Sequence, residues 1–546
     1  MKMKTTKFIV LAGILFLIIA CGESFLDTEP ITTRTEINYY TTPAEASEAL
    51  VGCYDALQLI WSGSGIAMPV ASDVMSDLCF GGTGAGDGDS YPMIDQFDKT
   101  VSPSDLNNFE GNWINYYKGI YRCNVLISKI DQVNWTGQEA LRGQIEAEAR
   151  FLRAFFYFDL VRMFERVPLI TVPTKDNVPQ SDPDLTYQVI TEDLMFAIEN
   201  GNDLTYNEIG ETEYGHADKW AAESMMARVF LYYTGYYGKP DLVGMVSKAE
   251  VLAYLEEVIS DGGFGLVENF SDLWPAASTY TAAKAGQPIA DNTYAGETNK
   301  EVVFAIKYTY TSDYNGNTDG NGWLVMNGLR GTNSPKYGYG SGWGACTVLP
   351  GVYTGWDAND KRRNASVMAI AEETISFDNA DQKEHTGYMT KKYVPTCDKD
   401  GNSIAVDQGG VNFMIGQFQD YFSIRYADVL LMAAELGSPN ALTYVNQVRT
   451  RAGVSVLAAV DKDVIYEERR LELAFEGIRY WDLLRYDNTL SYAAGKVAFT
   501  GTVTTGGTEV PKVIDGNKLI ATHGLFQIPN NQITLSDGVL TQNPGW

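Results

Sequence analysis

Residues 148–168 have the sequence EARFLRAFFYFDLVRMFERVP and form most of a long predicted helix that begins near residue 138. The apolar positions that predict this helix are Leu141, Ile145, Leu152, Phe155, Leu160 and Met163. Side chains at such spacing lie along one side of a helix, where they can pack against other elements. Pro168 ends the helix because proline has no backbone N–H to donate. Residues 167–173 are predicted to continue as a short extended strap.

Further helices are predicted on both sides of this segment. Thr42, Pro43 and Glu45 form a helix start, because threonine caps the first turn, proline fits it and the glutamate completes a capping box. The predicted helices cover residues 42–61, 109–133, 138–164, 185–201, 218–237, 249–261, 424–436, 440–451 and 464–486. Several are joined in pairs by short links. This predicts tetratricopeptide-like helical hairpins, although the sequence shows no clear repeat of about 34 residues.

Residues 264–410 differ from the rest of the chain, because Gly, Asn, Asp, Ser, Thr and aromatic residues replace the helical pattern. One β-type run stands out at residues 301–310, and residues 62–91 are also predicted to be a loop. We therefore predict a mainly α fold, a tetratricopeptide-like helical-hairpin scaffold with an inserted irregular, loop-rich subdomain. The predicted division is residues 1–20 (signal peptide), 21–40 (tether), 41–262 (helical region), 263–423 (irregular ligand-binding subdomain) and 424–546 (C-terminal helical region).

The last predicted helix carries three pairs of opposite charges, each three residues apart: Arg469–Glu472, Glu476–Arg479 and Asp482–Arg485. Residues at this spacing are neighbours on a helix surface, and each such pair stabilises a helix by only about 0.2–0.5 kcal/mol. We therefore expect this face to be solvated or to lie in an interface, and not to be a catalytic array.

The N-terminus has the features of a secretory signal peptide. Lys2, Lys4 and Lys7 precede 13 uncharged residues, 8–20, and a small residue stands before Cys21. Thirteen residues are too few to cross a bilayer core of about 30 Å. Residues 18–21 also resemble a bacterial lipobox, and this resemblance implies that Cys21 becomes the first mature residue and carries lipid, palmitate included. The alternative is an ordinary signal peptide that is cut beside a cysteine.

Charge excludes one class of partner. The formal net charge is −28, and −31 once the three lysines of the signal peptide are removed. Such a chain repels phosphate backbones, so we expect no nucleic-acid partner. The same charge favours neutral or cationic ligands over anionic ones such as uronates, unless the local charge reverses it.

The pattern of cysteines and histidines predicts no metal or cofactor site. Besides Cys21 there are five cysteines, an odd number without a CxxC motif: Cys53, Cys79, Cys123, Cys346 and Cys397. We expect mostly buried thiols, although an exported chain could form one bridge. The three histidines are scattered singly, which argues against a histidine-based metal site or triad. No carboxylate pair can be chosen as acid and nucleophile from sequence, so we name no catalytic residue and keep a glycoside hydrolase as an alternative.

One short motif could bind calcium. Asp313, Asn315, Asn317 and Asp319 alternate along the chain, and Ca²⁺ prefers oxygen ligands. The EF-hand pattern is broken by Thr318, where it requires glycine. We therefore expect a polar turn and no metal site.

Aromatic residues are abundant, with 33 Tyr, 23 Phe and 10 Trp in the chain. An aromatic face and the face of a sugar ring bury each other's apolar surface, and Trp and Tyr also offer a polar group. Six of these residues lie in the irregular region and are predicted to form a platform for sugars: Trp274, Tyr280, Trp323, Tyr337, Tyr339 and Trp343. The alternative is that they fill the small core of this region.

In combination, several segments resemble the SusD/RagB family of Bacteroidetes outer-membrane lipoproteins. Residues 148–168 resemble its E-a-x-F-L-R-A helix and the V-P that follows it. Residues 425–435 (RYADVLLMAAE), 446–453 (NQVRTRAG) and 467–485 (EERRLELAFEGIRYWDLLR) resemble its C-terminal signature. Further matches are residues 25–27, 49–54, 113–130, 216–232, 360–362, 526–529 and 542–546. Their shared order along nearly the whole mature chain makes the combination specific.

The resemblance implies four tetratricopeptide-like helix pairs with a loop-rich insertion between the third and the fourth. It also implies a lipid-anchored, cell-surface protein of the outer membrane that captures oligosaccharides and delivers them to a SusC-like TonB-dependent transporter. Some members of the RagB branch handle peptides, which is a second alternative. The family places an early loop near the same pocket, which adds four candidate ligand-binding residues: Asp73, Asp77, Phe80 and Tyr91.

Overall fold

The computed structural model describes residues 39–61, 66–210, 213–278, 293–313, 317–330, 339–398 and 402–546. The predicted signal peptide, the tether up to residue 38 and the lipidated Cys21 lie outside the described residues. Tyr280 and Tyr337, two of the predicted platform residues, also lie outside them.

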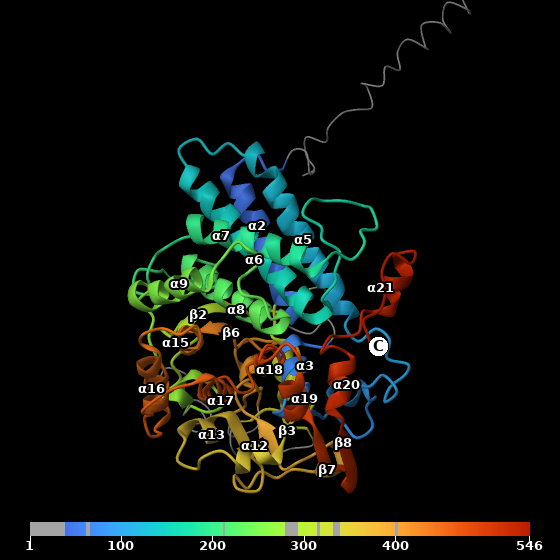
Figure 1. Cartoon of the computed structure of the whole chain (residues 1–546). Coiled ribbons are helices and arrows are strands. Elements are labelled where there is room, and N and C mark those ends of the chain that lie inside the picture. Colours follow the sequence, from blue (N-terminus) through green and yellow to red (C-terminus); the bar gives the residue numbers. More distant parts are fainter. Residues whose placement is uncertain are drawn as a thin grey trace, which may run out of the picture.

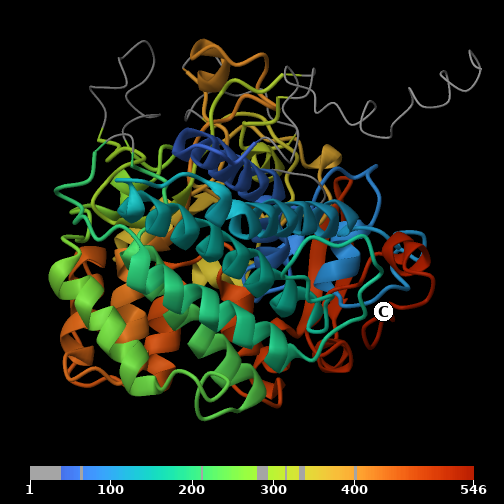
Figure 2. The ribbon, with the colours of Figure 1, turned by 90° about the horizontal axis from the view of Figure 1, so that it is seen from above.

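Six long helices form the first part of the scaffold, and they confirm the predicted helical segments. They are α2 (Pro43–Trp61), α5 (Glu110–Lys129), α6 (Glu139–Phe164), α7 (Pro183–Asn200), α8 (Lys219–Tyr237) and α9 (Lys248–Asp261). From α5 onward each packs on the next, and α2 packs on α5 and α6 (Figures 1 and 2). The C-terminal half of α6 is buried on nearly every side, as expected of a helix at the centre of a scaffold.

The starts of these helices follow the caps that the sequence contains. The Glu45 backbone N–H donates to Oγ1 of Thr42, and the Thr42 N–H donates to Oε2 of Glu45, 3.0 Å away. Asp218 caps α8 by accepting a hydrogen bond of 2.7 Å from the Ala221 N–H. Local sequence is sufficient here because both partners of each cap lie within three residues.

The C-terminal helices continue the scaffold as α15 (Tyr426–Glu435), α16 (Ala441–Ala452), α17 (Lys462–Glu472) and α18 (Arg479–Leu484). The single helix predicted for residues 464–486 is wrong, because the chain breaks between Glu472 and Arg479. Phe475 and Gly477 there have φ values of 60° and 71°. A Cβ on Gly477 would lie 2.8 Å from the Cα of Pro69, so both the positive φ and this close contact require glycine.

The predicted loop at residues 62–91 is more regular than expected. It contains α3 (Met68–Val74), whose residues are all buried, and β1 (Cys79–Gly81), and it leads into α4 (Ser90–Asp95). A seven-residue helix is too short for its periodicity to stand out in sequence.

The four-stranded sheet joins this early segment to the irregular region. Its order is β1-β3-β5-β4, with β3 (Cys346–Val348), β5 (Tyr388–Thr390) and β4 (Val367–Ala369), and all neighbours are antiparallel. Gly81 pairs with Cys346 in β3. The predicted β-type run at residues 301–310 contains β2 (Val302–Ile306), which pairs with β6 (Tyr421–Arg425).

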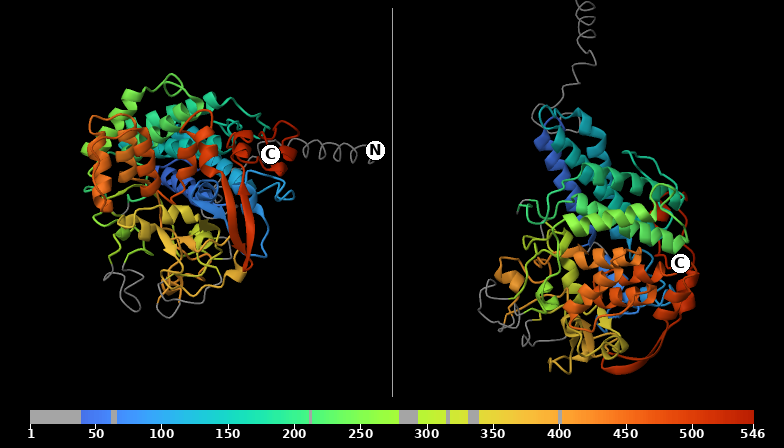
Figure 3. Two further views of the ribbon diagram at one scale, coloured as in Figure 1. Left: turned by 60° about the horizontal axis from the view of Figure 1, so that its bottom comes forward. Right: turned by 60° about the vertical axis from the view of Figure 1, so that its left-hand side comes forward.

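The rest of the irregular region consists of short helical turns, α11 (Gly322–Asn327), α12 (Pro350–Thr354), α13 (Lys361–Ser366), α14 (Ile404–Asp407), η3 (Phe270–Leu273) and η5 (Asn379–Asp381). After α18 the chain adds α19 (Ser491–Val497), the hairpin β7 (Phe499–Thr505) and β8 (Thr508–Ile514), α20 (Gly516–Ala521) and α21 (Asn530–Leu535). Figure 3 shows this hairpin in red beside the blue early segment and the yellow irregular region. The helix α21 was not among the helices predicted from the sequence.

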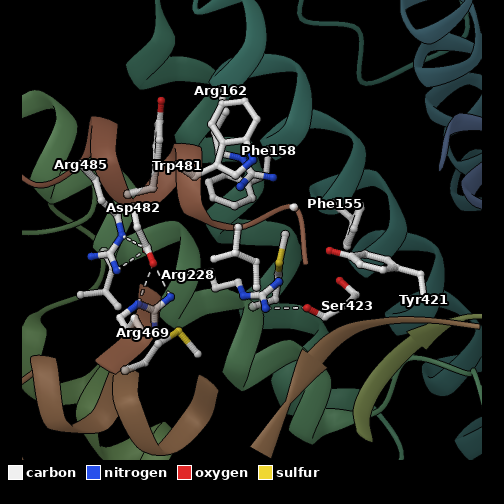
Figure 4. Close-up of a pocket in the computed structure, with 16 residues that line it drawn as sticks. Phe155, Phe158, Arg162, Arg228, Tyr421, Ser423, Arg469, Trp481, Asp482 and Arg485 are labelled. Carbon is white, nitrogen blue, oxygen red and sulfur yellow. Dashed lines mark hydrogen bonds and ion pairs between the residues drawn. The ribbon is translucent and has the colours of Figure 1, made fainter. Parts of the chain in front are cut away.

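The charged residues of the last predicted helix are buried, which corrects the expected solvated face. Of the three predicted pairs only Asp482–Arg485 forms, at 2.7 Å. Arg469 contacts Asp428 and Asp482 from α17, and Arg485 also contacts Glu435 of α15. Figure 4 shows Arg469, Asp482 and Arg485 joined in this network, with Arg162 lying against Trp481 and Phe158 nearby.

A second buried network joins the irregular region to the helices. Arg425 at the end of β6 donates to Glu476 at 2.7 and 2.8 Å, to Glu301 at 2.5 Å and to Glu472 at 3.0 Å. Lys392 donates to Glu476 at 2.7 Å. All five side chains are almost completely inaccessible to solvent. Buried charges are tolerated only when they are paired in this way.

Glu223 on α8 lacks such compensation. Its side chain is fully buried, the Lys219 ammonium is 3.7 Å away, and its two oxygens have no hydrogen-bond partner among the described residues. Burial raises the pKa of Glu223 from 4.5 to about 8. A carboxyl whose pKa is raised on folding contributes stability at low pH, and this contribution is lost as pH rises from the unfolded to the folded pKa.

We therefore expect the stability of Glu223→Gln, which cannot titrate, to rise relative to that of the wild type between pH 5 and pH 8. The free energy of unfolding of the variant minus that of the wild type should be larger at pH 8 than at pH 5 by more than about 1.4 kcal/mol, the equivalent of one pKa unit. Urea unfolding at both pH values measures it. A difference that is the same at pH 5 and pH 8 would contradict the burial argument.

The described cysteines, Cys53, Cys79, Cys123, Cys346 and Cys397, are free and buried, which confirms the expected thiols. Within the described part of the chain no helix is both long and apolar enough to cross a bilayer.

Candidate ligand-binding site

Two of the predicted platform residues are part of the hydrophobic core. Trp274 and Trp323 have no solvent-exposed surface. The Trp323 ring lies 4.4 Å from that of Tyr393, and the Trp274 ring lies 5.1 Å from it. The prediction that Trp274 and Trp323 present a ring face to a sugar is therefore wrong for this structure. They pack together because β2, β6 and α11 converge there, as the alternative interpretation proposed.

Tyr339 and the early-loop candidates are also mostly buried. Tyr339 is 6% exposed, and its hydroxyl donates to Glu373 at 2.6 Å. Phe80 packs edge-on against Phe499 of the hairpin, with ring centroids 4.8 Å apart. Tyr91 is 7% exposed. These rings stabilise the region and offer no open face to a ligand.

The two early aspartates have structural surroundings as well. Asp77 forms a two-pronged ion pair with Arg479 of α18, with both distances 2.7 Å. This pairing lowers the pKa of Asp77. Asp73 is fully buried in α3, and burial raises its pKa well above the usual value. Direct ligand contact by Asp73 or Asp77 is therefore not supported by their positions.

Among the predicted platform residues that the structure describes, Trp343 is the one open to solvent, with 39% of its surface exposed. Its backbone runs along the end of α11. The Trp343 N–H donates to the Val325 carbonyl at 2.8 Å, and the Gly344 N–H donates to the Gly328 carbonyl at 3.0 Å. The ring is thus attached to a fixed backbone three residues before the strand β3.

Arg330 lies against this ring and connects it to two other segments. Its guanidinium carbon is 5.7 Å from the centre of the Trp343 ring. One terminal nitrogen is 3.1 Å from Asp87 of the early loop, and Nε is 3.2 Å from Asp381 of η5. We call the surface formed by Trp343, Arg330, Asp87 and Asp381 the Trp343 patch. It combines an apolar ring face with carboxylates that can accept hydrogen bonds from hydroxyls.

Close backbone contacts hold the segments of the Trp343 patch together. The Gln382 side chain is buried and its amide donates to the carbonyls of Thr83 and Gly344, both at 3.0 Å. The tip of the β7–β8 hairpin closes one side, where the Gly506 N–H donates to the Gln382 carbonyl at 3.0 Å. Lys512 of β8 adds a buried ion pair to Asp95 of α4 at 2.7 Å. These contacts place the early loop beside the Trp343 patch.

A substitution at Gly84 tests how closely the early loop packs against Arg330. A Cβ at this position would lie 2.3 Å from the guanidinium carbon of Arg330, whereas a Cβ at Gly86 would meet nothing within 4 Å. We expect Gly84→Ala to push the guanidinium of Arg330 aside and to lower the free energy of unfolding by about 0.5–1 kcal/mol, because the displaced atoms end a flexible side chain in exposed ion pairs. Gly86→Ala is the matched control and should change it by less than about 0.5 kcal/mol. Urea denaturation measures both, and equal effects would contradict the packing.

Arg330, Asp87 and Asp381 were not among the residues that sequence analysis selected. Asp87 and Arg330 are 243 positions apart and Asp381 lies 51 positions beyond Arg330, so no local motif joins them. The family resemblance is the signal that pointed to the early loop, which contains Asp87.

The predicted calcium motif and the metal-ligating side chains can be compared with the described residues. No group of three His, Cys, Asp or Glu side chains there could hold a metal ion. Asp313, Asn317 and Asp319 form a polar turn, in which the Asn317 N–H donates to Asp313 and the Asp319 N–H donates to Asn317. The cavity of Figure 4, about 40 Å³ between α6, α8 and α18, has room for little more than water.

Two family models match the chain. The C-terminal part, residues 372–546, matches the model described as "SusD family". Residues 89–231 match the model described as "Starch-binding associating with outer membrane". These two stretches cover much of the helical scaffold on either side of the irregular region.

Similar proteins span almost the whole chain. A "SusD-like protein" of Bacteroides ovatus is 25% identical, over 89% of this chain and 84% of its own length. "SusD-like protein P2" of Formosa agariphila is 24% identical over all of both chains.

Solved structures share the fold. A "Laminarin binding SusD-like protein" has a TM-score of 0.72 at 26% identity, over 93% of this chain and all of the other. "Surface glycan-binding protein A" from Bacteroides uniformis has a TM-score of 0.70 at 26% identity, over 92% and 99%. With the tetratricopeptide-like scaffold and both family models in agreement, this chain belongs to the SusD/RagB family.

Proposed function

We propose that this chain is a cell-surface lipoprotein that captures oligosaccharides at the Trp343 patch and breaks no bond in them. It then delivers them to a SusC-like TonB-dependent transporter of the outer membrane. In this proposal the irregular subdomain, residues 263–423, carries the binding surface, and lipid on Cys21 holds the protein at the membrane. Stable anchoring requires more than one acyl chain, which a lipidated N-terminal cysteine supplies.

The observation that carries the proposal is the exposed ring of Trp343 among solvent-facing carboxylates. Stacking on an indole buries apolar C–H surface of a sugar ring, and carboxylates accept hydrogen bonds from its hydroxyls. Two similar solved structures, each 26% identical to this chain, are described as laminarin-binding and glycan-binding proteins. This supports a carbohydrate ligand over a peptide.

Isothermal titration of the mature chain against a panel of oligosaccharides and a panel of peptides tests the proposal. We expect at least one oligosaccharide to bind and to be recovered intact by chromatography. Binding of peptides alone would favour the peptide-capturing alternative. Release of shorter products would show a glycoside hydrolase instead.

Anchoring and delivery are tested separately. We expect mass spectrometry of the mature protein to find acyl groups on Cys21, and the outer-membrane fraction to contain it in a complex with a TonB-dependent transporter. An unmodified N-terminus would contradict lipid anchoring, and a protein that purifies without any transporter would contradict delivery. Neither result bears on glycan capture, which the titration tests.

A further inference from the structure

The charges of the Trp343 patch are not evenly exposed. Arg330 holds the centre, and its side chain is 18% exposed. The two carboxylates that contact it, Asp87 and Asp381, are 46% and 57% exposed. Among the described residues the cation therefore lies beneath the carboxylates, so a ligand that approaches them from solvent meets negative charge first.

A second cation beside the patch is arranged in the same way. Lys383 follows Gln382 and is 8% exposed, whereas its partner Asp89 is 52% exposed. The Lys383 ammonium donates to Asp89 at 2.6 Å and to the carbonyls of Asp87 and Gly88 at 2.7 and 3.0 Å. An ammonium has three donors, so these contacts leave none for a ligand.

Arg330 is also committed to the protein. Its Nε and one terminal nitrogen bind Asp381 and Asp87. The other terminal nitrogen lies over Gly84, 2.3 Å from where a Cβ would stand, so it faces the early loop. A guanidinium that recognises a carboxylate or sulfate does so with two parallel donors, and Arg330 has no such pair turned to solvent.

From this arrangement we infer that the Trp343 patch selects uncharged oligosaccharides and rejects glycans that carry carboxylate or sulfate groups. The inference rests on the proposed function and adds the class of ligand. When ionised, Asp87 and Asp381 can accept hydrogen bonds but cannot donate them, so the hydroxyls of a neutral sugar can donate to both. A ligand carboxylate placed at the same distance would instead be repelled by them, and by the net charge of the whole chain.

Matched pairs of polysaccharides test the inference: laminarin, xylan and soluble starch, each with its carboxymethylated derivative. Affinity is measured with the mature chain by titration at 50 mM and 300 mM salt. We expect carboxymethylation to weaken binding of the preferred polysaccharide at least tenfold at low salt. The loss should shrink at high salt, because screening reduces repulsion between exposed charges.

Two variants locate the effect. In the double variant Asp87→Asn/Asp381→Asn the penalty for carboxymethylation should fall by at least threefold, because the exposed negative charges are gone. Asp131→Asn, which removes an 85% exposed carboxylate elsewhere on the surface, should leave the penalty unchanged. For each variant the affinity for the neutral polysaccharide is divided by the affinity for its carboxymethylated derivative. A change in overall affinity or folding cancels in this ratio.

The outcomes separate the inference from the proposed function. Equal or tighter binding of a carboxymethylated polysaccharide overturns the inference and leaves glycan capture standing. An unchanged penalty in the double variant overturns the role assigned to Asp87 and Asp381. Binding to no member of any pair overturns the inference and contradicts the proposed function together.

Discussion

Arg425→Ala is expected to destabilise the protein by about 3–5 kcal/mol, which is a large part of the stability of a typical domain. The guanidinium of Arg425 is 1% exposed and contacts Glu301, Glu472 and Glu476. Removing it takes the nearest cation from Glu301. It also takes one of the cations that pair with Glu472 and Glu476, which keep Arg451 and Lys392. Because Arg425 ends β6 and Glu476 lies between α17 and α18, the loss should also loosen the irregular region from the helices.

Urea unfolding monitored by circular dichroism measures this effect. Arg166→Ala is the matched control, since Arg166 forms a 3.8 Å pair with Asp182 in which both side chains are 55% exposed. An exposed pair contributes about 0–1 kcal/mol. Arg425→Lys keeps one charge and should fall between the two if Arg425→Ala does not fold. A loss of less than about 1 kcal/mol for Arg425→Ala would contradict the role assigned to the buried network.

Trp343→Ala is expected to weaken oligosaccharide binding by 10- to 100-fold, which corresponds to about 1.4–2.8 kcal/mol. The size follows from the loss of roughly 60–110 Å² of apolar contact at about 25 cal/mol per Å². Stability should change little, because the ring is half-exposed and its backbone is fixed by hydrogen bonds from Trp343 and Gly344 that do not involve the side chain.

Titration of the mature wild type and the variant with the same oligosaccharide measures the change. Tyr121→Ala is the control, because Tyr121 is a 50% exposed aromatic residue on α5, outside the Trp343 patch. Its affinity should equal that of the wild type. If Trp343→Ala binds as well as the wild type, or Tyr121→Ala loses as much, the patch is not the binding site.

The helical scaffold could be predicted from sequence because its signals are local. Caps such as Asp218 and Thr42 act within three residues, and the apolar stripe of α6 repeats at every turn. The break at Gly477 was not predicted, and the glycine packs there against the backbone of Pro69, about 400 residues away, a contact that no local pattern marks. The charges of α17 have the spacing of surface pairs, and their burial is visible only when the partners from α15 are in place.

The candidate site shows the same division. The composition of the irregular region predicted a platform of exposed aromatic residues, but it could not separate the exposed Trp343 from the buried Trp323. Both stand in glycine-rich sequence, and their exposure depends on whether Tyr393 and Tyr421 pack against the ring. Arg330 and Asp381 were missed because a pair of surface charges has no distinctive pattern until the chain brings them beside a ring.

The crystal structure of the mature chain with a bound neutral oligosaccharide is the most direct test of capture at the Trp343 patch. We predict an intact ligand with one sugar ring stacked on Trp343 and hydroxyls within hydrogen-bond distance of Asp87 or Asp381. A ligand bound elsewhere while the Trp343 ring stays in contact with solvent, or a cleaved ligand, would contradict the account.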